Sequence, residues 1–291
     1  MLEQILYRHL QSCTTELSQH LAQYNDRMAI FNQEAPDDQD EGWGEGSQYG
    51  RIVYAVNLQD SAERIVSGTL TVDVICQNGK QIPEEMEKEV RPLLDGYFFT
   101  TDYQTIAAQW SASHYFTDAS RKEEGVTIAF TLLAFPKQTT SEPDPIQAIN
   151  EYTKELIPNS CVIGLDTIEE AWKPSNNVPA IYWRLVDISP CSWIPSTYAC
   201  EWQTANCRAH ILAPDKDIEI TLSRTIDNGF SFRKSLRLPD DTYMRVDHNI
   251  RIYPGADRLK QGQVTLEATY GLVRQIKSNP IQNIQVKGMD M

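Results

Sequence analysis

The spacing of hydrophobic residues predicts the secondary structure of the first half of the chain. Leucines and isoleucines recur every three, four or seven positions over residues 2–23, which indicates one amphipathic helix. A proline followed by glutamates at Pro83 indicates the start of a second helix, and Gly96 is expected to end it. Short apolar or alternating segments predict strands over residues 27–32, 51–59, 66–77, 96–117 and 125–136.

The same order of elements begins again after a polar segment with prolines at residues 137–145. A helix is predicted from Ile146. Pro214 opens a second helix, which we expect to end at Gly229 before the aromatic residues of GFSF, just as Gly96 precedes GYFF. Alternating segments predict strands over residues 161–166, 180–189 and 198–213, followed by a closing hairpin from residue 253.

The two closing hairpins also align in sequence. The seventeen residues from Tyr115 match those from Tyr253 without a gap at Tyr115/Tyr253, Lys122/Lys260, Val126/Val264, Thr127/Thr265 and Thr131/Thr269. In the preceding strands the alignment places Cys207, Ala209 and Ile211 where the first half has Val72, Val74 and Cys76. This recurrence of order and spacing indicates an internal duplication. The alternative is that two unrelated domains share turns and alternating strands.

These elements predict an α+β protein of two similar domains, each a mostly antiparallel β-sheet packed with two helices. The first unit is expected at residues 1–140 and includes an acidic, glycine-rich loop at 35–50. The second, diverged unit is expected at residues 141–274, followed by a polar tail at 275–291. A chain of 291 residues is long enough for two domains that each bury a core.

Charge and composition narrow the range of functions. The net charge is −14, and residues 1–140 contribute most of it, with 10 Lys and Arg against 21 Asp and Glu. A surface that grips phosphates needs clustered bases, so we expect no specific nucleic-acid binding. No apolar run reaches the roughly 18 residues that cross a bilayer, and the first residues do not resemble a signal peptide, so we expect no membrane association. Six cysteines are too few for a disulfide scaffold and are interpreted as reduced thiols.

The acidic segment from Ala35 to Gly50 has the composition of an exposed, mobile loop. It contains five acids and no base. Its glycines superficially resemble a phosphate-binding loop, but no strand leads into them and the carboxylates would repel phosphate. We therefore interpret the segment as an acidic surface formed by Asp37, Asp38, Asp40, Glu41 and Glu45.

No residue pattern in the sequence indicates a catalytic, metal or cofactor site. Cys191, Cys200, Cys207 and His210 lie within twenty residues, but they lack the tight pairs of a zinc site. Cys207 and His210 are three positions apart in a predicted strand and are expected on opposite faces. There is also no G-x-S-x-G elbow, so we expect that the protein is not an enzyme and needs no cofactor.

Tryptophans near loops and hairpin ends are the remaining candidates for function. Exposed tryptophans anchor protein partners, and the candidates are Trp43, Trp172, Trp193 and Trp202. The alternative is that these side chains cap the core of their own domain. The sequence leaves both interpretations open.

The order of elements in the first half resembles the tail terminator and tail completion proteins of long-tailed bacteriophages and the related minor capsid and neck proteins. The resemblance covers about 135 residues: the leading helix, RIVYAVNLQ after a polar loop, TLTVDVICQ, the helix PEEMEKEVRPLL and the closing hairpin. It extends to the second half only through the internal repeat. It contains no catalytic motif.

The resemblance implies a virion structural protein, encoded by a phage or prophage, that forms a ring at the end of the tail tube. Its implied partners are other copies of itself in a ring-like homo-oligomer and other virion proteins. Its implied location is the virion, and the bacterial cytoplasm during assembly. Because family members are usually single domains in hexamers, a tandem fusion is expected either to form a ring of three chains or to serve in another part of the virion. An acidic loop that faces the channel would keep passing DNA from adhering.

Two other functions remain open from the sequence. One is a non-catalytic module of a bacterial cell that binds a protein or peptide through aromatic side chains at its hairpin ends. The other is an enzyme whose site is assembled from scattered residues.

Overall fold

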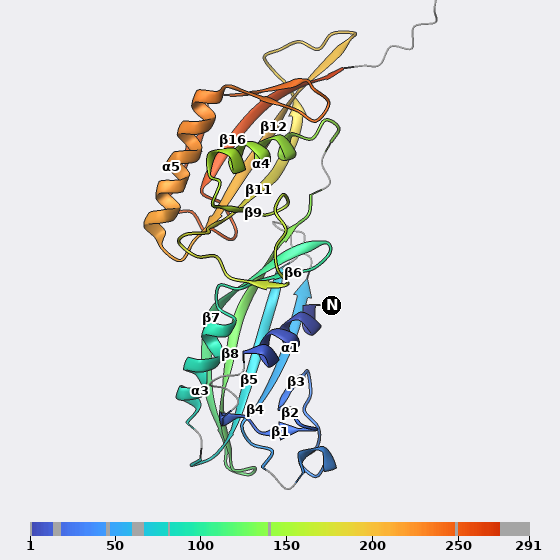
Figure 1. Cartoon of the computed structure of the whole chain (residues 1–291). Helices are drawn as coiled ribbons and strands as arrows, with labels where there is room; N and C mark the ends of the chain where they lie inside the picture. The colour runs from blue at the N-terminus through green and yellow to red at the C-terminus, as the bar shows by residue number, and fades with distance from the viewer. Residues whose placement is uncertain are drawn as a thin grey trace, which may run out of the picture.

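The computed structural model contains two curled β-sheets stacked end to end in an elongated molecule (Figure 1). The structure describes residues 2–13, 19–44, 47–59, 67–80, 82–138, 141–247 and 250–273. The chain is a mixed α and β protein in which strands predominate, and this broad class agrees with the sequence prediction. The polar tail expected at residues 275–291 lies outside the described residues.

The first sheet has seven strands in the order β10, β6, β7, β8, β5, β4, β3. Its strands are β3 (Ile30–Asn32), β4 (Arg51–Gln59), β5 (Ser67–Gln77), β6 (Phe98–Thr100), β7 (Gln104–Asp118), β8 (Glu123–Pro136) and β10 (Ala171–Trp172). Only β3 and β4 pair in parallel, and the other neighbours are antiparallel. A separate two-stranded ribbon joins β1 (Gln23–Tyr24) and β2 (Arg27–Met28). The predicted strand over 96–117 is divided, because a turn at residues 101–103 separates β6 from β7.

The described helices beside the first sheet include α1 (Leu2–Ser12) and α3 (Pro83–Val90), with short 3-10 helices η1 (Glu41–Trp43) and η2 (Arg91–Leu93). Leu6 and Leu10 of α1 belong to the same buried cluster as Tyr54 and Val72 of the sheet. The predicted helix over residues 2–23 is wrong at its end, because α1 stops at Ser12 and β1 begins at Gln23.

The second sheet has the strand order β13, β14, β16, β12, β11, β9, and β15 pairs with β16 off this path. Its strands are β9 (Cys161–Val162), β11 (Ala180–Pro190), β12 (Cys200–Leu212), β13 (Ser235–Arg237), β14 (Tyr243–Val246), β15 (Arg251–Ile252) and β16 (Val264–Val273). Again only the two strands of this sheet that come first in the sequence, β9 and β11, pair in parallel. The six strands β3, β4, β5, β8, β7 and β6 therefore correspond one by one to β9, β11, β12, β16, β14 and β13. Neighbouring strands also pair in the same parallel or antiparallel sense in both sheets.

Strand registers agree with the sequence alignment of β5 with β12 and of β8 with β16. In the first sheet Val72 pairs with Ile128 and Val74 with Val126. The aligned residues pair in the same way, Cys207 with Leu266 and Ala209 with Val264.

On the strands that pair with β8 and β16, the gapless sequence alignment differs from the structural pairing by one position. Tyr115 pairs with Val126, but Val264, which aligns with Val126, pairs with Ile252 and not with Tyr253. A gapless alignment cannot follow such irregularities, and β7 contains one register shift of its own after Trp110.

The second sheet is accompanied by α4 (Pro145–Leu156) and α5 (Lys216–Arg233). Asp144 and Asp215 cap their first turns through side-chain hydrogen bonds. Gly229 does not end the second helix as predicted. It lies inside α5, where a Cβ atom would come within 2.4 Å of Leu156 of α4, so this glycine allows close packing of the two helices.

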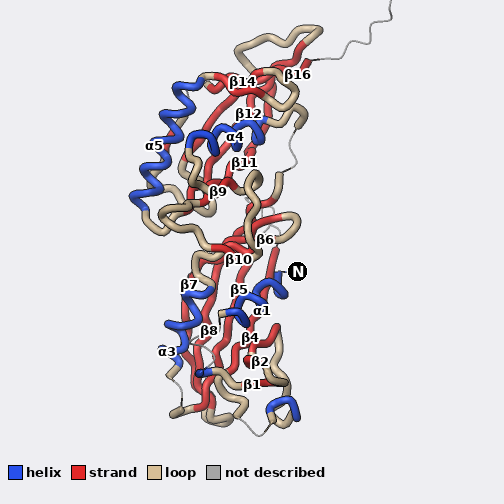
Figure 2. The backbone as a smooth tube through the Cα atoms, viewed as in Figure 1, coloured by secondary structure: helices blue, strands red, loops and turns tan. Residues whose placement is uncertain are grey.

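The two sheets meet through a buried cluster at their facing ends. Phe98, Leu133 and Phe135 of the first sheet contact Tyr182 and other apolar residues of the second sheet and its loops. Strand β10, from the crossing between β9 and β11, pairs with β6, so residues of the second half complete the first sheet (Figure 2). The strands of the first sheet therefore come from both sides of the boundary predicted at residue 140.

Candidate functional site

The acidic segment at residues 35–50 is tied to the end of the first sheet by Arg51. The Asp38 carboxylate lies 2.6 Å from Arg51 Nη1, and Glu123 lies 3.1 Å from Nη2. The hydrogen bond from Arg51 lowers the pKa of Asp38 below its ordinary value, although burial opposes this. Asp40 caps η1 by accepting a hydrogen bond from Gly42 N, and it accepts another from Tyr24. The expected mobile loop is therefore an organised structure in its described part.

Trp43 lies inside this structure and is only 5% exposed. Its indole N–H donates to the carbonyl of Asp37 at 3.0 Å, and its ring packs edge-on against Tyr24 and Phe31. The burial and contacts of Trp43 fit the interpretation that it caps the core of its own domain. They do not fit the interpretation that it contacts a partner. All four described acids, Asp37, Asp38, Asp40 and Glu41, are exposed, although Asp38 is also paired with Arg51 and Asp40 caps η1. Glu45 lies outside the described residues.

Trp172 is part of the junction between the sheets. It belongs to β10, and its ring packs edge-on against Phe98 with centroids 5.8 Å apart. Nearby, Arg8 and Glu170 form an exposed ion pair at 2.8 Å between α1 and the same crossing segment. Trp172 therefore makes its contact within the chain.

Trp193 and Trp202 lie at the opposite end of the second sheet, near the tip of the β11–β12 hairpin. Trp193 is 49% exposed, and the Arg245 guanidinium lies over its ring at 4.7 Å. Trp202 is half-buried and pairs with Gly271, where an added Cβ atom would lie 3.5 Å from its ring. Of the four tryptophans, Trp193 is exposed and Trp202 is half-buried, and a partner contact at these two side chains stays a prediction.

The sequence analysis missed other residues at this end. Tyr243 on β14 is 64% exposed, and Val273 at the end of β16 is 66% exposed. Lys234 and Arg237 are exposed at the two ends of β13. In the sequence, only the basic segment FRKSLR before a turn pointed to these residues. This segment contains no catalytic motif. Together with Trp193 and Trp202, these residues form what we define as the distal end of the second sheet.

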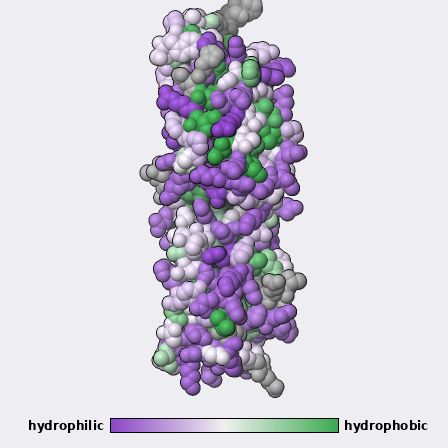
Figure 3. Space-filling view, turned by 90° about the vertical axis from the view of Figure 1, so that its left-hand side faces the viewer, coloured by the Kyte–Doolittle hydropathy of each residue, from purple (hydrophilic) through white to green (hydrophobic). Residues whose placement is uncertain are grey.

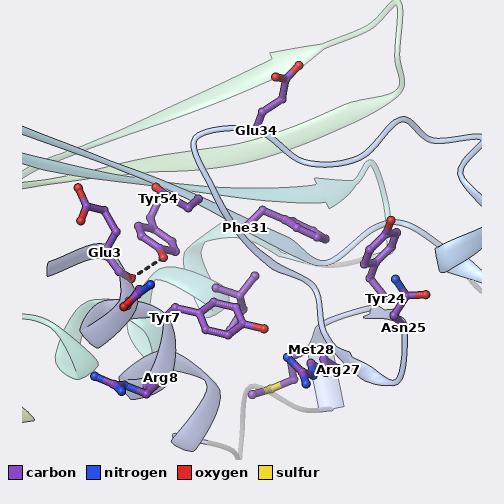
Figure 4. Close-up of a pocket in the computed structure, with 13 residues that line it drawn as sticks. Glu3, Tyr7, Arg8, Tyr24, Asn25, Arg27, Met28, Phe31, Glu34 and Tyr54 are labelled. Atoms are coloured by element: carbon purple, nitrogen blue, oxygen red, sulfur yellow. Dashed lines mark hydrogen bonds between the residues drawn. The ribbon is translucent and has the colours of Figure 1, made fainter. Parts of the chain in front are cut away.

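An open groove of about 830 Å³ lies between α1 and strands β1–β4 of the first unit (Figure 4). Four aromatic side chains line it, those of Tyr7, Tyr24, Phe31 and Tyr54, together with charged residues of both signs. The Tyr54 hydroxyl donates to the Glu3 carbonyl at 2.7 Å, and burial raises the pKa of Tyr54 to about 12. The groove thus offers apolar surface and hydrogen-bonding groups without an activated acid or base.

The closest approach to a nucleophilic pair is Cys13 with His9, at 4.0 Å. His9 Nε2 donates to the Leu93 carbonyl at 2.7 Å, so this nitrogen carries a proton and is not free to accept one from the thiol. Burial raises the pKa of Cys13 and lowers the pKa of His9, which keeps both groups neutral. The pair is not an activated dyad.

The cysteines of the second sheet are also separated from its histidine. Cys207 lies in the cluster that α4 and α5 cover, whereas His210 packs against Phe135 at the junction. The predicted placement on opposite faces of the strand is therefore confirmed. Within the described residues, no three His, Cys, Asp or Glu side chains come together as a metal site.

A scan against protein-family models finds no family that matches this chain, and a search of curated proteins finds no similar sequence. The helices in the described part of the structure are all too short or too polar to cross a membrane. The side facing the viewer in Figure 3 is predominantly hydrophilic, with hydrophobic side chains gathered mainly over the second unit.

Proposed function

We propose that the protein is a structural component of a phage or prophage virion, of the tail or the head–tail junction, and that it acts by assembly and not by catalysis. The observation that carries the proposal is the repetition of one strand order in two sheets of one chain, joined end to end through buried side chains. In this proposal the chain is a duplicated assembly unit. Each unit is a mostly antiparallel sheet with two helices.

Two further observations support assembly as the mode of action. The Cys13–His9 pair is not activated, because His9 is committed to a backbone carbonyl. In addition, the distal end of the second sheet exposes the aromatic side chains of Trp193, Tyr198 and Tyr243, a residue type enriched in protein interfaces. The partners in this proposal are further copies, in a ring of three chains, and other virion proteins.

The placement of the acidic segment toward a DNA channel stays a prediction. Asp38 is held by Arg51, and Asp40 caps a helix, so half of the described carboxylates of the segment stabilise the fold. The proposed locations remain the virion and the bacterial cytoplasm during assembly.

The test is the protein content of particles produced by a host that carries this gene. Mass spectrometry of gradient-purified particles is expected to detect the chain. Deletion of the gene is expected to give separate heads and tails or tails of abnormal length by negative-stain microscopy, restored by the wild-type gene in trans. Infectious particles of normal form without the chain would refute the proposal.

The aromatic groove of Figure 4 favours a second candidate function, a non-catalytic module that binds a peptide. Tyr24 and Phe31 present their rings along an open surface of the size that binds short extended segments. A random peptide display selection against the wild-type protein and a Tyr7→Ser/Phe31→Ser variant tests this function. Enrichment of one motif by the wild type alone supports it, and equal enrichment or none refutes it.

A further inference from the structure

The junction inside the chain uses one end of each sheet and leaves two ends free. Strand registers define which residues are equivalent between the sheets. Thr69 pairs with Thr131 in the first sheet, and the aligned Thr204 pairs with Thr269 in the second. Counting along the strands from these pairs gives the equivalents of the junction residues that lie on strands.

The residues that the first sheet contributes to the junction have equivalents at the distal end of the second sheet. The junction residues Phe98, Ala107, Leu133 and Phe135 correspond to Arg237, Tyr243, Gly271 and Val273. In the first sheet these positions are buried by the second sheet. In the second sheet, Tyr243 and Val273 are mostly exposed, and Trp202 covers Gly271. The second sheet therefore ends in the equivalent of a docking surface.

The free end of the first sheet is equivalent to the other side of the junction. The junction residues Ala180, Tyr182 and Leu212 correspond to Tyr49, Arg51 and Gln77. The crossing that supplies β10, between β9 and β11, corresponds to the acidic segment between β3 and β4. We define Tyr49, Arg51, Ile75, Gln77 and this acidic segment as the proximal end of the first sheet.

Charge is complementary between the two free ends. At the junction β10 adds to β6, and the equivalent of β6 is β13. Exposed Lys234 and Arg237 flank β13, and Arg237 also forms an ion pair with Asp241 at 2.7 Å. The acidic segment presents Asp37 and Glu41 to solvent. The strand equivalent to the β10 acceptor thus carries two bases, one of them already ion-paired, and the segment equivalent to the β10 donor is acidic.

We propose that the distal end of the second sheet docks the proximal end of the first sheet of a second copy of this chain, with the acidic segment beside β13. The proposal rests on the proposed function only in taking assembly as the mode of action. Because the contact joins two different surfaces, it leads to a closed ring or an open filament, depending on the rotation between successive copies.

Charge reversal tests this contact. In sedimentation velocity, the wild-type chain is expected to form species larger than a monomer that dissociate as NaCl rises from about 0.05 to 0.5 M. Lys234→Glu/Arg237→Glu is expected to weaken self-association at least roughly tenfold. Asp37→Lys/Glu41→Lys is expected to do the same, because it reverses the other side of the contact.

Mixing the two variants separates docking from a general effect of charge. Within each variant, the reversed end has the same sign as the remaining wild-type end and repels it. In a mixture, the two wild-type ends attract one another, and so do the two reversed ends. Association is therefore expected to return when the two variants are mixed in equal amounts, and self-association is expected to return when all four substitutions are combined in one chain. The matched control is Lys216→Glu/Arg224→Glu on the exposed side of α5, which is expected to associate as the wild type does.

A photo-crosslinking residue at position 273 gives an independent readout. Phe135, its equivalent, packs against Tyr182 and His210, so cross-links are expected on the equivalent residues Arg51 and Ile75 of the second copy or their neighbours. The same residue at position 232, which is 85% exposed on α5, is expected to give no such cross-links.

The outcomes distinguish this contact from the proposed function. A wild-type chain that stays monomeric at about 1 mM, or four substitutions that fail to restore association, would overturn the contact even if the chain is found in virions. Particles that lack the chain would overturn the proposed function while leaving a charge-specific contact in place.

Discussion

Phe135 and Tyr182 meet edge to face across the junction of the two sheets, with ring centroids 5.0 Å apart. Phe135 lies near the end of β8 and Tyr182 near the start of β11, so this contact joins the two sequence repeats. The Tyr182 hydroxyl also donates to the Pro136 carbonyl at 3.0 Å. The pair therefore combines apolar burial with a directional bond that orients one sheet on the other.

Removing the Tyr182 ring is expected to destabilise the junction. Tyr182 is 2% exposed, so Tyr182→Ala should lower the free energy of unfolding by about 3–5 kcal/mol, whereas Tyr182→Phe should cost about 1 kcal/mol through the lost hydrogen bond. Urea unfolding followed by tryptophan fluorescence measures both. The control is Tyr198→Ala, at a side chain 78% exposed. Equal midpoints for Tyr182→Ala and the control would contradict the packing.

The buried pair of Arg51 and Glu123 predicts a second pattern of stabilities. The two side chains are 7% and 6% exposed, and Arg51 Nε has no hydrogen-bond partner among the described residues. Arg51→Met leaves Glu123 as a buried, unpaired charge and should cost about 3–5 kcal/mol. Replacing both residues by Met should recover most of that loss, because no charge is left buried.

Chemical denaturation of the two variants and of Arg8→Met tests this prediction. Arg8 pairs with Glu170 in an exposed position, so its loss should cost no more than about 1 kcal/mol. A double variant less stable than Arg51→Met would show that the pair stabilises the fold by more than mutual neutralisation.

Glu87 predicts a dependence of stability on pH. It accepts hydrogen bonds from the Tyr115 hydroxyl and from Ser113 Oγ, and it lies 3.3 Å from Arg91 Nη1. Burial raises the pKa of Glu87, but these hydrogen bonds and the Arg91 charge outweigh burial and lower it below 4.5. Because the folded pKa is depressed, the stabilisation is present above the unfolded pKa and is lost as pH falls through the folded pKa.

Glu87→Gln should therefore cost about 1–3 kcal/mol at pH 7 and progressively less below about pH 4.5. The measurement is the difference in urea midpoint between wild type and variant from pH 7 to pH 3. Glu169→Gln, at an exposed loop residue, serves as the control for general charge effects. A difference that stays constant over this range would show that the Glu87 carboxylate does not drive the effect.

Gly68 in β5 has no room for a side chain. A Cβ atom there would lie 2.0 Å from the backbone oxygen of Asn57 on β4. Because backbone cannot move aside as a flexible side chain does, Gly68→Ala should destabilise the first sheet by about 1–3 kcal/mol. Gly255→Ala, where no atom lies within 4 Å, should change stability by less than about 0.5 kcal/mol. Thermal unfolding of both variants compares them, and equal melting temperatures would refute the close contact.

The local elements were largely predictable because alternation along a strand depends on neighbours in sequence. The predicted strand at 51–59 is β4, and the prediction at 180–189 differs from β11 by one residue. Helix ends were less predictable. Gly229 looks like a stop by analogy with Gly96, but contact with α4 keeps it inside α5, and that contact depends on residues more than seventy positions away.

In the candidate site, too, the composition was evident from the sequence, whereas the contacts were not. The acidic composition of residues 35–50 was evident, but its anchoring by Arg51 and the burial of Trp43 follow from packing against the sheet. The tryptophans likewise could not be sorted by sequence. Trp172 lies at the junction only because its segment returns to β6, and Trp193 stays exposed because the hairpin tip extends past the core.

By itself, the sequence determined that the chain repeats one order of helices and strands, because hydrophobic periodicity and helix starts are local signals. It also determined the strongly acidic first half. The tertiary structure alone decided that β10 completes the first sheet, that Phe135 and Tyr182 join the repeats, and that the equivalent surface beside Tyr243 is left open. These are contacts between residues distant in sequence, and their free energy depends on which surfaces meet, which no local pattern encodes.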